Sequence, residues 1–201
     1  MKRIIGVLAA LMLLGAAGRA AAGVIDVNFD NLSGQGQVPN GYGGIYWSGN
    51  WDYYGFPQPP FNPQSGPNRV YTDYGSPVAS QAGENTFSFQ NAAVFDGAYF
   101  SGLPFADLKF NLYYQNVLVF TSADLQPSAT PTFLASGYSG LVDKVGVFSQ
   151  ANDYYVMDDV TYEPVSRAGA PEPAGLTLLG VGALGMAFCV WRRKRRVVST
   201  T

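Results

Sequence analysis

The chain has 201 residues, no histidine and one cysteine, Cys189. Without histidine, Ser-His-Asp and Cys-His catalysis and His-ligated zinc are excluded, and a single cysteine excludes an intrachain disulfide. Between Val24 and Val165 there are 13 acidic and three basic residues (3 − 13 = −10), a balance that argues against a nucleic-acid partner because phosphate contacts dominate such affinity.

Residues 1–22 have the parts of a secretory signal peptide. Lys2 and Arg3 are followed by an apolar run of 14 residues, Ile4–Ala17, and then by the small residues Ala20–Ala22. The run is short for a membrane span, which needs about 20 residues. We therefore predict an N-terminal signal helix that is cleaved before Gly23.

The segment from Gly23 to Val165 is expected to be one β-domain, because apolar and polar residues alternate and no helical period is present. Gly, Pro and Asn separate the alternating runs, and Gln115-Asn116 is typical of a hairpin tip. Many short strands of this kind favour an antiparallel, jelly-roll-like β-sandwich. The clearest alternating runs are 25–29, 86–89, 108–114 and 156–162.

A cluster of aromatic residues is the first candidate site. Eight aromatic residues fall within 20 positions, beside amide and carboxylate side chains. Flat rings next to such groups suit sugars, which stack their C–H faces on rings and exchange hydrogen bonds through hydroxyls. The Gly and Pro content of residues 55–67 predicts a long loop, and Trp51, Tyr53 and Tyr54 are the preferred ligand residues because we expect them in that loop and not in an alternating strand. The alternative is that Tyr42, Ile45 and Trp47 are core residues and the rest of the cluster folds the loop onto the sandwich. The eight are Tyr42, Tyr46, Trp47, Trp51, Tyr53, Tyr54, Phe56 and Phe61.

Four aspartates form the second candidate site. Asp26 and Asp30 lie on the first predicted strand, and Asp158 and Asp159 lie on the last. Terminal strands are often neighbours in a sandwich, and converging carboxylates would suit a structural Ca²⁺. The alternative is four solvated side chains on exposed faces. No other cofactor is predicted.

An enzyme is a third class to weigh. A glycosidase needs two opposed carboxyl groups, and the domain has only two glutamates, Glu84 and Glu163, with no motif that singles out an aspartate pair. We therefore predict that the protein is not an enzyme.

The C-terminal region combines a linker, a short motif, an apolar stretch and a basic cluster. Residues 166–170 form a small-residue linker, and Pro171, Glu172 and Pro173 follow it. Residues 174–191 carry no charge and, as a helix, would span roughly 27 Å, close to a hydrocarbon core. The positive-inside rule keeps the next cluster cytoplasmic and near lipid headgroups. That cluster is Arg192, Arg193, Lys194, Arg195 and Arg196, and residues 197–201 end the chain.

This tail closely resembles the PEP-CTERM sorting signal of exopolysaccharide-producing Gram-negative bacteria over residues 171–196. The resemblance implies an exosortase-type processing enzyme as a partner, with Pro171–Pro173 as the recognised element. Two prolines hold that element in the extended form that proteases bind. A plain single-pass anchor is the alternative.

The β-domain resembles exported β-sandwiches that precede such tails. The matching segments are Phe29-Asp30-Asn31-Leu32, Gly41–Trp47 and Met157–Thr161. Together these observations predict an exported cell-surface or matrix protein, anchored by its C-terminus after crossing the inner membrane. Its domain is expected to bind extracellular polysaccharide weakly through the aromatic loop. A structural or adhesive matrix component is the second possibility, and a glycan-active enzyme is the third.

Overall fold

The computed structural model describes residues 23–72 and 82–165, and the remaining segments lie outside the described residues. The predicted signal helix, linker, sorting motif, transmembrane helix and basic cluster all fall outside this part. Within the described residues, no helix is long and apolar enough to cross a membrane. Ala22–Val165 is one compact unit that contains every strand found among the described residues.

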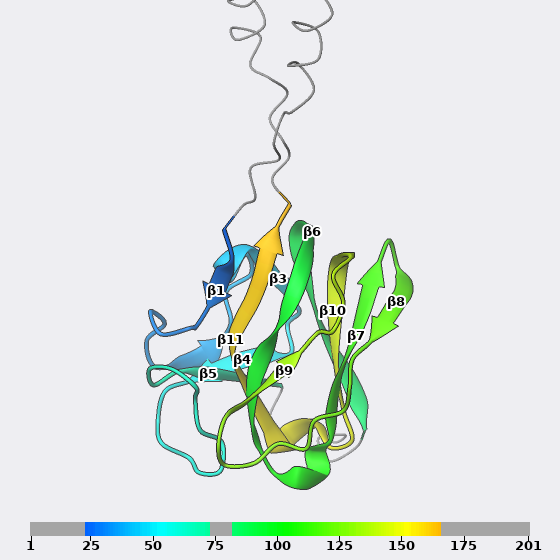
Figure 1. Cartoon of the computed structure of the whole chain (residues 1–201). Coiled ribbons are helices and arrows are strands. Elements are labelled where there is room, and N and C mark those ends of the chain that lie inside the picture. The colour runs from blue at the N-terminus through cyan, green and yellow to red at the C-terminus, as the bar shows by residue number, and fades with distance from the viewer. Residues whose placement is uncertain (1–22, 73–81, 166–201) are drawn as a thin grey trace, which may run out of the picture. The chain divides into compact units, whose positions relative to one another are not determined.

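The unit is mainly β and its strands pair antiparallel, which confirms the expected fold class at that level (Figure 1). In the part of the chain that the structure describes, three short 3₁₀ turns interrupt the strands: η2 (Tyr42–Gly44), η3 (Pro104–Ala106) and η4 (Asn152–Tyr154). The strands are β1 (Ile25–Val27), β2 (Gln35–Gln37), β3 (Ile45–Trp47), β4 (Trp51–Tyr54), β5 (Arg69–Thr72), β6 (Gly83–Gly102), β7 (Leu108–Tyr114), β8 (Val117–Thr121), β9 (Thr132–Ala135), β10 (Leu141–Ser149) and β11 (Tyr155–Pro164).

The long strand β6 connects two groups of strands. Its first half pairs with β3 and β10, and β10 continues through β7 to β8. Its second half pairs with β9 and β11, and β11 continues through β5 and β4 to β2. The core lies between inward-facing residues of both groups, and every second residue is buried along most of β6 and β7.

Several sequence predictions can be checked directly against the strands. The alternating runs at 86–89, 108–114 and 156–162 all lie within strands. Gln115 and Asn116 form the two-residue turn between β7 and β8, with φ values of 52° and 63°, as a type I′ hairpin requires. The first and last strands are neighbours, since Asp26 on β1 is opposite Thr161 on β11.

Candidate functional site

The loop between β4 and β5, residues 55–68, is held in place by a buried arginine. Arg69 is 1% exposed and donates hydrogen bonds to the carbonyl oxygens of Pro67 (3.0 Å) and Phe56 (2.7 Å). Its guanidinium carbon lies 3.7 Å from the centre of the Tyr54 ring, a cation–π contact. Burial raises the pKa of Tyr54 despite the opposing effect of Arg69, so its hydroxyl stays neutral at physiological pH.

The second half of the same loop is tied to other strands. The Asn62 side chain donates to the carbonyl of Ala129 (2.6 Å), and the Ser101 hydroxyl donates to the carbonyl of Asn62 (2.6 Å). The amides of Gln64 and Ser65 donate to one carboxylate oxygen of Asp158, at 2.8 and 3.0 Å. Hydrogen bonds therefore fix both halves of the predicted long loop to the neighbouring strands.

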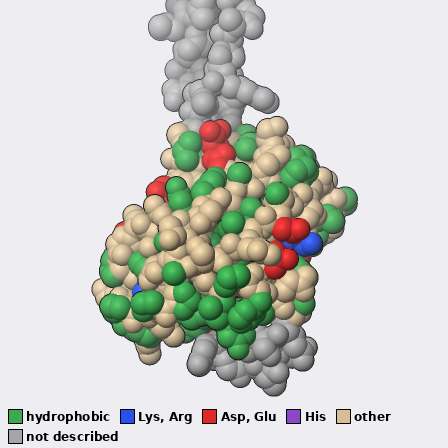
Figure 2. Space-filling model, turned by 60° about the horizontal axis from the view of Figure 1, so that its bottom comes forward, with side chains coloured by type: hydrophobic (Ala, Val, Ile, Leu, Met, Phe, Trp, Pro, Cys, Tyr) green, Lys and Arg blue, Asp and Glu red, His purple; other side chains and the backbone are tan. Residues whose placement is uncertain are grey.

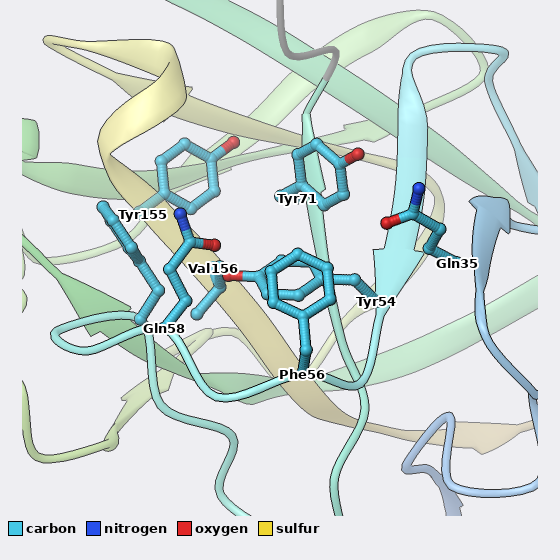
Figure 3. Close-up of a pocket in the computed structure, with 8 residues that line it drawn as sticks. Gln35, Tyr54, Phe56, Gln58, Tyr71, Tyr155 and Val156 are labelled. Carbon is cyan, nitrogen blue, oxygen red and sulfur yellow. The ribbon is translucent and has the colours of Figure 1, made fainter.

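A cavity of about 360 Å³ lies between this loop and strands β2, β5 and β11 (Figure 3). The rings of Phe56 and Tyr71 lie 4.6 and 5.3 Å from that of Tyr54. The amides of Gln35 and Gln58 enter from opposite sides (Figure 3), and no described lining residue is charged. The cavity is in the size range of ligand pockets and offers rings with a few polar groups. The lining residues are Gln35, Tyr54, Phe56, Gln58, Phe61, Tyr71, Tyr155 and Val156.

The three aromatic residues preferred from the sequence are strand residues of β4, so their expected place in the loop is wrong. Trp51 is fully buried and its indole N–H donates to the carbonyl of Thr86 (3.1 Å), so it is not available to stack on a ligand. Tyr53 is partly buried and its hydroxyl donates to the carbonyl of Ser33 (3.0 Å). Of these three residues, only Tyr54 lines the cavity, and no more than 5% of its surface is exposed.

The four aspartates converge where β1, β11 and the loop meet. The Ser65 hydroxyl lies 2.7 Å from an oxygen of Asp159 and 3.3 Å from one of Asp30. The other oxygen of Asp30 is buried and has no hydrogen-bond partner. Its carboxylate packs against Gly66, whose φ is 43° and where any larger side chain would overlap it. Burial, and then the charges of Asp159 and Asp30, raise the pKa of Asp26.

Asp158 is the most deeply buried of these carboxyl groups, with 2% of its surface exposed. Burial raises its pKa to about 8, although the amide donors from the loop and from Asp159 oppose that shift. Burial also raises the pKa of Asp159. Among the described residues, no group of three or more Asp, Glu, His or Cys side chains has a geometry that could hold a metal ion. Calcium binding here stays a prediction.

Neither a protein-family model nor a curated protein matches this chain. Among solved structures, the chain is similar to a mutant of a family 29 carbohydrate-binding module, a structure that probes ligand recognition by that family. The similarity has 14% identity and a TM-score of 0.41, and it covers 71% of this chain and 92% of the other. It is too slight to carry an argument about fold family or ligand.

Proposed function

We propose that the β-domain binds extracellular polysaccharide weakly, through the cavity between the 55–68 loop and strands β2, β5 and β11. The observation that carries the proposal is the lining: aromatic rings and two amides, with no charged group among the described lining residues. Rings can stack on the apolar faces of sugars, while Gln35 and Gln58 can exchange hydrogen bonds with hydroxyls. The neutral lining favours an uncharged stretch of glycan.

The same lining supports binding rather than hydrolysis. Glycoside hydrolysis uses two carboxyl groups that flank the scissile bond. Among the described residues that line the cavity, none carries a carboxyl group. We accordingly keep the proposal of a non-enzymatic domain, on a sandwich of the jelly-roll type.

Replacing Phe56 with alanine is expected to weaken glycan retention about two- to twelvefold, because an aromatic contact contributes about 0.5–1.5 kcal/mol. Phe56 is 51% exposed, so the variant should fold normally. The measurement is retention of the full chain, in mild detergent, on the host's own exopolysaccharide. Phe105→Ala is the matched control, because Phe105 is 56% exposed on η3 and is not among the cavity residues.

Equal retention of the Phe56 and Phe105 variants would contradict the cavity as the binding site. No retention of the unaltered chain would contradict glycan binding altogether, and would favour a structural or adhesive matrix component.

We further propose that the domain is exported and delivered by its C-terminal tail, on the strength of the sequence of residues 1–22 and 171–196. Replacing Pro171, Glu172 and Pro173 with alanines is expected to leave precursor in the inner membrane, because the extended element that a processing enzyme would grip is lost. Fractionation of cells and immunoblotting measure this. Normal processing and release of the triple variant would contradict the sorting role, and replacing Val197–Thr201 with alanines serves as the control.

A further inference from the structure

A second hollow of about 450 Å³ adjoins the cavity between the 55–68 loop and strands β2, β5 and β11. Gln35 and Phe56 line both spaces. Because the two spaces share these residues, a ligand that lies along the cavity can continue into the second hollow. The other lining residues of the second hollow are Leu32, Gly34, Gly55, Pro67 and Asn68.

The buried Arg69 that holds the loop also fixes two sides of the second hollow. Its guanidinium donates hydrogen bonds to the carbonyls of Phe56 and Pro67, which lie near opposite ends of the loop and both line the hollow. The wall of the hollow is therefore formed before a ligand arrives. Preorganisation of this kind lowers the conformational entropy that binding costs.

Asn68 gives the second hollow a fixed hydrogen-bond acceptor. The residue is 2% exposed, and its Nδ2 donates to the carbonyls of Phe29 (3.0 Å) and Leu32 (2.7 Å). Because both amide protons are used in this way, the orientation of the amide is set and Oδ1 is turned away from those carbonyls. No described residue donates a hydrogen bond to Oδ1, yet the atom is not among the fully covered polar atoms without a partner. It can therefore accept a hydrogen bond from a ligand hydroxyl.

Gly55 leaves this oxygen uncovered. A Cβ at position 55 would lie 2.5 Å from Asn68 Oδ1, closer than real Cβ atoms come to other heavy atoms. Gly55 is not among the glycines with a positive φ, so its backbone conformation alone does not require glycine. What requires it is the space that the Asn68 side chain takes up. Both residues line the second hollow, so the missing side chain keeps the acceptor accessible there.

The second hollow is uncharged, as the cavity is. None of its described lining residues carries a formal charge. Figure 2 shows the same character over one face of the domain, where neutral polar and hydrophobic groups cover most of the surface and acidic and basic side chains occupy small areas. A neutral chain with hydroxyl groups fits this lining, whereas the excess of acidic residues in the domain would repel an anionic chain.

We propose that the cavity and the second hollow form one extended site for a neutral polysaccharide chain that spans both, with Asn68 Oδ1 accepting a hydrogen bond from a sugar hydroxyl. Phe56, whose side chain is 51% exposed, lies between Gln58 and Gln35 in the view of Figure 3 and can contact sugar units in both parts. The inference rests on the proposed glycan binding and deepens it, because it makes affinity depend on chain length and names a residue that contacts a hydroxyl.

The test is a calorimetric titration of the full chain, in mild detergent, with neutral fragments of the host's own exopolysaccharide that have been separated by length. Long fragments, which reach both spaces, should bind more tightly than short fragments, which fill only the ring-lined cavity. Gly55→Ala places a methyl group against Asn68 Oδ1 and should weaken the binding of long fragments about two- to twelvefold, the range of one hydrogen bond. Short fragments should bind this variant as they bind the unaltered chain.

Gly36→Ala is the matched control. Gly36 is an exposed residue of β2 that lines neither space, and an added Cβ would come no closer than 3.8 Å to Tyr53. Gly34→Asn is a second way to obstruct the hollow, for the case in which Gly55→Ala lowers the melting temperature. No atom lies within 4 Å of an added Cβ at position 34, and its φ of 82° is one that asparagine tolerates. This variant should also weaken the binding of long fragments selectively.

Equal affinity of the two obstructing variants and Gly36→Ala for long fragments would overturn the inference. Equal affinity of the unaltered chain for short and long fragments would overturn it as well. If Phe56→Ala weakens the binding of every fragment in the same experiment, glycan binding in the cavity stands without the second hollow. If no fragment binds the unaltered chain, both proposals fail.

Discussion

Trp51→Ala is expected to lower the free energy of unfolding by about 3–5 kcal/mol, the usual cost of removing a buried tryptophan side chain. Trp51 is fully buried, its ring centre lies 5.8 Å from that of Trp47 and 6.3 Å from that of Phe87, and its indole N–H bonds to a strand carbonyl. Truncation would leave both a void and the unpaired carbonyl of Thr86. Denaturant titration followed by circular dichroism measures the loss.

The matched control for this prediction is Tyr46→Ala on the neighbouring strand β3. Tyr46 is also a strand aromatic but is 49% exposed, so its truncation should change the free energy of unfolding by less than about 1 kcal/mol. A Trp51→Ala variant that unfolds like the unaltered chain but loses glycan retention would contradict the core role, and would restore Trp51 as a ligand residue.

Period-two alternation correctly placed strands at 86–89, 108–114 and 156–162, because it depends on which residues face the core. It failed at β4, whose sequence Trp-Asp-Tyr-Tyr has only one residue that is plainly polar. Trp51 and Tyr54 are both buried although they point to opposite faces, the first into the core and the second beneath the cavity. A four-residue strand with two covered faces has no alternation that the sequence can display.

The candidate site was only partly predictable for a related reason. The aromatic content and length of the 55–68 loop indicated a binding surface, and the loop does form one wall of a cavity. Tyr71, Tyr155 and Gln35 complete that cavity from three other strands, and strand pairing alone brings them together. Local sequence carries no signal for such pairings, whereas the convergence of the aspartates followed from the common pairing of terminal strands.

Asp158→Ala is expected to lower the free energy of unfolding by about 2–3 kcal/mol. The variant would leave the amides of Gln64, Ser65 and Asp159 without their acceptor, and each unsatisfied buried donor costs about 1–3 kcal/mol, offset by the relief of burying a carboxyl group. Asp158→Asn keeps one acceptor oxygen and should lose about half as much. Asp124→Ala, at an exposed position, should change little. If Asp158→Ala unfolds like the unaltered chain, the carboxyl group does not clamp the loop.

The burial of Asp158 should also make the free energy of unfolding depend on pH. Because burial raises the pKa of Asp158 from 3.8 to about 8, the folded state holds a proton between about pH 4 and pH 8 that the unfolded chain has released. The contribution of this group to stability therefore falls as pH rises through that window. Asp26 and Asp159 have raised pKa values and act in the same direction, so Asp158→Asn should weaken the dependence without removing it.

Thermal unfolding measured between pH 4 and pH 8 gives the pH dependence of stability, and the same experiment tests the predicted calcium site. A cation that binds ionised carboxylates would stabilise the fold mainly near pH 8. Calcium at pH 8 should raise the melting temperature of the unaltered chain in proportion to occupancy, and should do less at pH 5. The unpartnered oxygen of Asp30 is the reason to expect it, and Asp30→Asn should reduce the gain. A melting temperature at pH 8 that is identical with calcium and with a chelator would contradict the metal prediction, and would leave protonation as the way in which these carboxyl groups are tolerated.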